Sequence, residues 1–293
     1  MMAGRIAATL CLAALFLAPA EGYQWPVEQK TVVATFGQSF VGGFHRGVGI
    51  AGKGAAVRPI EAGELVFYRA EGDDPAGLPS GLGSYAVLEH GRNIRSLYGH
   101  VDLSPDILAG GRKTFGEADV IGAIGESGYT EGARLFLMVI DAAVGQIVNP
   151  YLILPPVEEK SRPVISNVTL SAKNASMRLP APGPAASGTW EVSAQIYDPS
   201  YFVRYFCPTA PYRIAVYLNG QETFQFAFDA VKDKDGVPRI YPSPDLSYSA
   251  VYADDFRMKL GAVQLKKGIA NLEISVRDFA GNERSQSFQF RVN

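Results

Sequence analysis

The 293-residue sequence is poor in several features on which common classes of function depend. It has three His and two Cys, a small supply of metal ligands and disulfide partners. Lys plus Arg total 27 against 29 Asp plus Glu, so it lacks the strongly basic surface that is typical of nucleic-acid-binding proteins. Hydrophobic residues make up 47% of the chain, which is enough to bury a core and excludes wholesale disorder.

Hydrophobic runs of membrane-spanning length are also lacking. The N-terminal run over residues 6–17 is too short for a bilayer, which needs about 20 residues. It follows Arg5 and precedes Ala18-Pro19-Ala20, the small-x-small pattern of a signal-peptidase site. We expect residues 1–20 to be a signal peptide and the mature protein to be periplasmic or secreted. Cys11 lies inside the run and not at the cleavage point, so we expect no lipoprotein anchor.

Cleavage leaves Cys207 as a single cysteine, which cannot form an internal disulfide. We expect it to be a small buried hydrophobic residue. The length suggests two domains, because a typical domain has about 150 residues. The sequence Pro155-Pro156 followed by charged residues is typical of a linker. The predicted domains are therefore residues 21–156 and 157–293.

The first domain is rich in glycine, with 23 of the 31 glycines between Gly22 and Gly145. Its short apolar runs are bounded by turns and often β-branched, which predicts strands. They cover residues 32–35, 63–68, 85–89, 93–98, 120–124 and 135–140. No sustained helical period is present, so an all-β domain is predicted.

In the second domain, apolar and polar residues alternate strictly, with the apolar ones at positions such as Trp190, Val192, Ala194 and Ile196. This alternation predicts half-buried strands. Such segments cover residues 189–197, 213–218, 223–228, 270–276 and 285–292, and Asn219-Gly220 predicts a hairpin turn. Strands at this spacing favour an antiparallel β-sandwich. The segment 278–282 (DFAGN) resembles the D-x-A-G-N turn of bacterial immunoglobulin-like domains, which implies that fold but no activity. Residues 233–236 (DKDG) are expected to form a solvated turn and not a calcium loop.

Six segments of the first domain follow one another in a characteristic order and at characteristic spacings. They are residues 43–51 (GFHRGVGIA), 56–66 (AVRPIEAGELV), 85–91 (YAVLEHG), 96–101 (SLYGHV), 120–125 (VIGAIG) and 148–152 (VNPYL). Together they closely resemble the LytM/lysostaphin-type zinc endopeptidases, which cut peptide bridges in peptidoglycan. The resemblance covers about residues 30–155 and implies the family fold, a small β-structure called the duplicated hybrid motif, with an open substrate groove.

The resemblance also implies a site. In that family an H-x-x-x-D pair and the second His of an H-x-H strand hold zinc. The first His of H-x-H and the His of a Y-x-H segment flank the attacking water. In this chain, His45 matches the first ligand, but Gly49 stands at the Asp position. His100 matches the Y-x-H histidine, whereas Arg134 and Phe136 stand where the family has the two histidines of H-x-H.

Catalytic zinc needs three protein ligands and an open position for water. The positions equivalent to the family's three zinc ligands hold His45, Gly49 and Phe136. Only His45 can bind a metal, so we expect no bound metal. Only His100 remains of the catalytic pair, with Arg134 at the other position, so no catalytic residue is expected. Asp102, Glu126 and Glu131 lie close in sequence to these motifs, but a rebuilt site is not favoured. His90 lies in a turn that is structural in this family.

Residues two apart on a strand share a face, so Arg134, Phe136 and Met138 should point together towards the former metal site. With His45 and His100 they are the candidate groove-lining residues. For both histidines, a role as hydrogen-bonded packing residues is as well supported as a role in lining the groove. For Phe136 and Met138, simple filling of the core or groove is favoured over a chemical role.

The favoured interpretation is a non-catalytic relative of these peptidases, a pseudoenzyme that binds peptidoglycan or regulates cell-wall hydrolysis. Its expected partner is peptidoglycan or a cell-wall hydrolase, with no cofactor and no nucleic acid. One alternative is an active zinc endopeptidase with unorthodox ligands. A second is an adhesive or scaffolding protein that works through its immunoglobulin-like domain.

Overall fold

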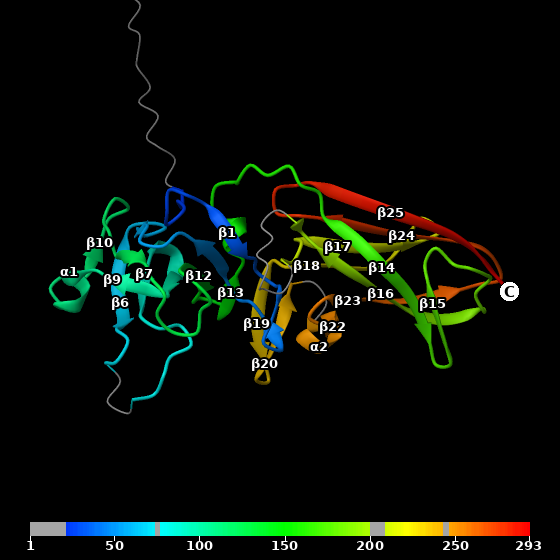
Figure 1. Cartoon of the computed structure of the whole chain (residues 1–293), viewed down its shortest axis with the longest axis horizontal. Helices are drawn as coiled ribbons and strands as arrows, with labels where there is room; N and C mark the ends of the chain where they lie inside the picture. The colour runs from blue at the N-terminus through cyan, green and yellow to red at the C-terminus, as the bar shows by residue number, and fades with distance from the viewer. Residues whose placement is uncertain (1–21, 74–76, 200–208, 243–245) are drawn as a thin grey trace, which may run out of the picture.

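The computed structural model describes residues 22–73, 77–199, 209–242 and 246–293. Their regular structure is almost entirely β-strand, and the fold is all-β, as predicted (Figure 1). The expected signal peptide of residues 1–20, which includes Cys11, lies outside the described residues, and so does Cys207. Within the described ranges, no helix is long and apolar enough to cross a membrane.

The elements of the first half begin at residue 31. They are β1 (Thr31–Ala34), β2 (Ser39–Phe40), β3 (Gly43–Phe44), β4 (Val48–Ala51), β5 (Ala56–Val57), β6 (Gly63–Arg69), β7 (Tyr85–Glu89), η1 (Gly91–Asn93), β8 (Ile94–Gly99), β9 (Val101–Leu103), α1 (Pro105–Leu108), β10 (Thr114–Phe115), β11 (Gly122–Ile124), β12 (Arg134–Asp141), β13 (Gln146–Val148) and η2 (Pro150–Leu152). Each strand predicted from the sequence corresponds to one of these within a residue or two.

The elements of the second half begin at residue 164. They are β14 (Val164–Ala172), β15 (Ala175–Arg178), β16 (Gly188–Tyr197), β17 (Arg213–Leu218), β18 (Gln221–Ala227), β19 (Ala230–Lys234), β20 (Val237–Tyr241), β21 (Leu246–Ser247), α2 (Tyr248–Val251), β22 (Tyr252–Asp254), β23 (Arg257–Leu265), β24 (Gly268–Arg277) and β25 (Glu283–Val292). The predicted hairpin turn at Asn219-Gly220 joins β17 to β18, and residues 235–236 form the turn between β19 and β20.

Strand β12 is central to the first half. It pairs antiparallel with β4, β8 and β13, and the main sheet continues through β7 and β6 to β10. Leu135 and Leu137 of β12 are fully buried and belong to the core of this half, together with Ile50 of β4 and Tyr98 of β8. This core lies on one face of the sheet, so the next residues along each strand point to the other face.

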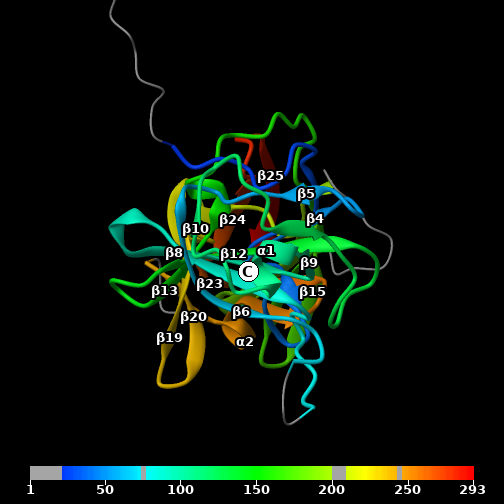
Figure 2. The ribbon, with the colours of Figure 1, turned by 90° about the vertical axis from the view of Figure 1, so that its left-hand side faces the viewer.

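The main sheet does not end within the first half of the chain. The β19–β20 hairpin of the second half adds to it, because β19 pairs with β13 through Ile147 and Val231. Figure 2, viewed from the first half, shows this hairpin projecting beside β13. Val231 and Ile240 are buried in the core of the second half, so the two halves share a sheet that crosses the linker.

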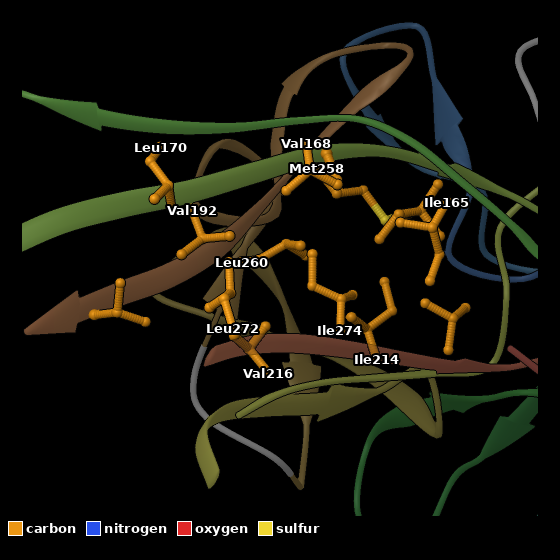
Figure 3. Packing of buried hydrophobic residues seen from close by; sticks show 14 of the residues in the cluster. Ile165, Val168, Leu170, Val192, Ile214, Val216, Met258, Leu260, Leu272 and Ile274 are labelled. Carbon is orange, nitrogen blue, oxygen red and sulfur yellow. The ribbon is translucent and has the colours of Figure 1, made fainter. Parts of the chain in front are cut away.

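The rest of the second half is a two-sheet sandwich. One sheet has the order β15-β14-β16-β23-β22 and the other β18-β17-β24-β25. Alternate residues point inward, as alternation in the sequence predicts, and the two sheets share one core (Figure 3). Figure 3 shows Leu170, Val192 and Leu260 on one side of this core and Val216 and Leu272 on the other.

Asn149 joins the two halves just before the linker. Its side chain is fully buried and donates through Nδ2 to the carbonyl oxygen of Phe228 at 2.7 Å. Its backbone N–H donates to the carbonyl oxygen of Asp229 at 2.9 Å, and its Oδ1 accepts from the N–H of Tyr151. A buried amide whose nitrogen and oxygen are both hydrogen-bonded fixes the register between the halves.

Candidate functional site

The pairing of β12 places the residues at the family-equivalent positions on one face. Phe136 pairs with Gly49 of β4 on one side and with Gly99 of β8 on the other. Arg134 and Phe136 are buried, and neither belongs to the core cluster that holds Leu135 and Leu137. Met138, the next residue on this face, is half-buried and pairs with Leu97.

Glycines surround Phe136 and leave room for its ring. A Cβ at Gly47 would lie 2.8 Å from the ring and 2.3 Å from the carbonyl oxygen of Leu137. A Cβ at Gly99 would lie 3.5 Å from the Cβ of Phe136. The ring of Phe136 thus occupies space that a side chain at position 47 would need.

Phe136 contacts both histidines of the site. Its ring centroid lies 5.2 Å from that of His45 and 6.5 Å from that of His100, both in edge-to-face geometry. The ring centroid of Phe40 also lies 5.7 Å from that of His45. The structure therefore brings the rings of His45 and His100 into contact with the ring of Phe136. The exposed fraction is 5% for His45, 3% for His100 and 9% for Phe136, so little of the cluster reaches solvent.

Both imidazoles have a defined tautomer. Nδ1 of His45 lies 3.1 Å from the carbonyl oxygen of Thr35, and Nδ1 of His100 lies 2.8 Å from that of Ser127. A carbonyl only accepts, so Nδ1 carries the proton and Nε2 carries the lone pair in the neutral ring. This is the orientation of a metal-binding histidine whose other nitrogen is held by a backbone acceptor.

The site disfavours positive charge on the imidazoles. Burial, followed by the nearby charge of Arg134, lowers the pKa of His45 from 6.5 to about 4. Burial also lowers the pKa of His100, and Arg134 acts in the same direction. Both histidines are therefore neutral near pH 7.

Arg134 contributes a positive charge to this face. Its guanidinium carbon lies 6.0 Å from the ring centroid of Phe40, and its exposed fraction is 6%. Burial lowers the pKa of Arg134 and the charge of Glu131 opposes that effect. The guanidinium of arginine stays protonated in proteins, so the group remains a cation near neutral pH.

The residues present do not fit a catalytic zinc ion. The three family-equivalent ligand positions hold one imidazole, a glycine without a side chain and a phenyl ring, where three donors are needed. A side chain at Gly49 would also start 3.0 Å from the Cβ of Ala34. The guanidinium of Arg134 adds a repelling charge near the same place.

The other sequence candidates lie outside the cluster. Glu126 forms an exposed ion pair with Lys53 at 3.2 Å, and Asp102 and Glu131 are exposed. His90 has a structural place: Nδ1 lies 3.1 Å from the carbonyl oxygen of Ala62 and Nε2 lies 2.7 Å from Oγ of Ser96.

A group that the sequence analysis missed lies where the two halves meet. Side-chain oxygens of Glu159, Asp198 and Asp278 lie within 4.8 Å of one another, and among the described residues this is the group with metal-ligand spacing. Burial raises the pKa of Asp278, although hydrogen bonds from Asn282 oppose that shift. The three acids are far apart in sequence, so no local spacing could reveal them. Asp278 and Asn282 are the polar ends of the D-x-A-G-N turn.

Comparisons with known proteins give limited matches. A family model that carries no functional description matches residues 162–293, less than half of the chain. No curated protein matches the chain.

Several solved structures are similar to parts of the chain. A zinc-containing peptidase from Vibrio cholerae has 20% identity over 40% of this chain and 36% of its own, with a TM-score of 0.33. The catalytic domain of the prophage-encoded protein EnpA from Enterococcus faecalis has 21% identity over 43% of this chain and 94% of its own, with a TM-score of 0.35. The antimicrobial peptidase lysostaphin from Staphylococcus simulans has 14% identity over 83% of this chain and 92% of its own, with a TM-score of 0.34. The chain thus spans about a third of the length of the first of these structures.

Proposed function

We propose that residues 21–156 form a LytM/lysostaphin-type domain that has lost its zinc site and acts without catalysis in the cell envelope. It binds peptidoglycan, or regulates cell-wall hydrolysis through a hydrolase partner, after export directed by residues 1–20. The second half, of immunoglobulin-like type, is a contact or spacing module. Six motif segments in register support the family assignment.

One observation carries the non-catalytic assignment. The side chain at the position of a zinc ligand is the phenyl ring of Phe136, and it packs against both remaining histidines. An apolar ring in this place offers no donor and excludes a metal-bound water, so the chemistry of the active family has no counterpart here.

Sedimentation of the full mature chain with purified peptidoglycan tests the proposal. We expect the chain to co-sediment with the wall material, and we expect no release of soluble wall fragments with or without added zinc. Zinc-dependent, chelator-sensitive release would establish the active endopeptidase instead. A chain that binds neither peptidoglycan nor a cell-wall hydrolase would contradict the proposal.

Matched surface variants show which half of the chain binds the wall material. Tyr129 is 69% exposed in the loop that follows Ser127, the partner of His100, and Ile269 is 63% exposed on β24. Under the proposal Tyr129→Ser weakens co-sedimentation and Ile269→Ser does not. The reverse result would favour an adhesive protein that works through its second half. Variants of the full chain are preferable to truncation after Pro156, because β19 and β20 complete the sheet of the first half.

A further inference from the structure

The β2–β3 hairpin lies over the polar groups of the site. The Phe40 ring is close to the ring of His45 and to the guanidinium of Arg134, at 5.7 and 6.0 Å. Phe40 is 37% exposed, whereas His45 and Arg134 are nearly inaccessible. The ring therefore lies between solvent and these two side chains.

The second half of the chain holds this hairpin by hydrogen bonds. Oγ of Ser39 lies 2.7 Å from the hydroxyl of Tyr248 and donates to Oδ1 of Asp255 at 2.5 Å. The hydroxyl of Tyr252 donates to the carbonyl oxygen of Gly37 at 2.9 Å, in a buried position.

Aromatic packing adds to these hydrogen bonds. Phe44, at the end of the hairpin, contacts Phe228, Tyr248 and Tyr252 with ring centroids 5.7 to 6.2 Å away. Gly37 has a φ of +84°, and a Cβ there would lie 2.2 Å from the Phe228 ring, so only glycine fits beneath that ring. Phe44 belongs to the core of the second half although it precedes the linker.

The hairpin has little stability of its own. Each strand has two residues, and the pair forms a separate two-stranded sheet. Val41 at its tip is 89% exposed and has a φ of +48°, an unfavourable conformation for a β-branched residue. A short hairpin of this kind is marginal in water without packing partners. Its position therefore depends on the contacts with the second half.

We propose that the β2–β3 hairpin is a cover over the face of β12 that carries Arg134 and Phe136, and that the second half keeps this cover closed. The second half would then regulate access to the first half, and a partner that engages the exposed Asp255 or the half-buried Tyr248 would open the cover. This inference rests on the proposed function, because it takes that face as the binding face.

Histidine modification by diethyl pyrocarbonate tests the cover in the full mature chain. The reagent acylates accessible neutral imidazole nitrogens, and the chain has three histidines, all in the described residues. The Tyr252→Phe variant removes one buried hydrogen bond from the cover. We expect His45 to be modified roughly fivefold faster, because a typical hydrogen bond shifts an opening equilibrium by about that factor.

Two controls make the result specific. His90, with both ring nitrogens engaged, should keep its modification rate in every variant, which reports an intact fold. Tyr241→Phe changes an exposed tyrosine of the same half and should leave His45 unchanged. An unchanged His45 rate in both Tyr252→Phe and Ser39→Ala would overturn the cover. A faster rate in chains that bind neither peptidoglycan nor a hydrolase would support the cover while contradicting the proposed function.

Discussion

The two faces of β12 pack against different kinds of neighbour. Leu135, Leu137 and Val139 lie on the core face, among aliphatic and aromatic side chains, and all three are fully buried. Arg134 and Phe136 lie on the other face, where the neighbours are two imidazoles and the ring of Phe40. One strand thus supplies both core side chains of the first half and the residues that contact the two histidines.

The difference shows that the two faces place different demands on their side chains. The core face needs only apolar side chains of suitable volume. On the other face, both histidines have Nδ1 bonded to a backbone carbonyl, as in a metal site. The phenyl ring of Phe136 contacts both imidazoles, and the charge of Arg134 acts on both. Substitutions on the two faces should therefore change different properties.

The largest effect is expected on the core face. Leu137→Ala removes a fully buried side chain and should lower the free energy of unfolding by about 2–5 kcal/mol. Met138→Ala, at the adjacent half-buried position on the other face, should cost clearly less. Urea unfolding of both variants measures this, and equal losses would contradict the division between the faces.

The next effect is a pH dependence on the site face. The folded-state pKa of His45 is lowered to about 4, below its ordinary value of 6.5, so the unfolded chain binds a proton first as pH falls. Stability should therefore fall between pH 6.5 and 4, by about 3 kcal/mol in total from this group. The depressed pKa values of His90 and His100 act in the same direction.

Unfolding in urea across this pH range, for the wild type and His45→Gln, isolates the contribution. The variant lacks the titrating group, so its stability should fall less steeply with decreasing pH. Parallel curves for the two proteins would show that His45 is not buried in its neutral form.

A smaller effect is expected in the polar network of the core side of β8. Oγ of Ser96 bonds both Nε2 of His90 and the hydroxyl of Tyr98, at 2.7 and 2.8 Å. Ser96→Ala leaves those two buried groups without this partner and should cost about 1–3 kcal/mol. Thermal unfolding measures the loss, and Ser171→Ala, at a half-buried serine on β14, is the control. A neutral Ser96→Ala would mean that His90 is held by packing alone.

Much of this architecture could be predicted from the sequence because its signals are local. Successive side chains of a strand point to opposite faces, so strands can be recognised from their apolar residues. The runs at 135–140 and 189–197 predict the bounds of β12 and β16 to within one residue. The grouping of His45, His100 and Phe136 was implied by the family resemblance alone, and in the structure the ring of Phe136 contacts both imidazoles. The Asn219-Gly220 turn follows from the backbone freedom of those two residues.

Features that depend on pairing between distant segments could not be predicted. Nothing local to residues 230–241 indicates that their hairpin adds to β13 across the linker. Glu159, Asp198 and Asp278 converge only once the sandwich and the linker are in place. The cover formed by β2 and β3 depends on Tyr248, Tyr252 and Asp255, more than 200 residues away in the chain.

Zinc binding to the full mature chain, measured by titration and by elemental analysis after dialysis, tests the central claim most directly. We expect far less than one zinc per wild-type chain, because the phenyl ring of Phe136 packs against both His45 and His100 and offers no donor. Phe136→His should gain zinc binding, since it places a third imidazole beside the two that already have Nδ1 bonded to a carbonyl. Stoichiometric zinc on the wild-type chain, lost in His45→Gln, would contradict the account.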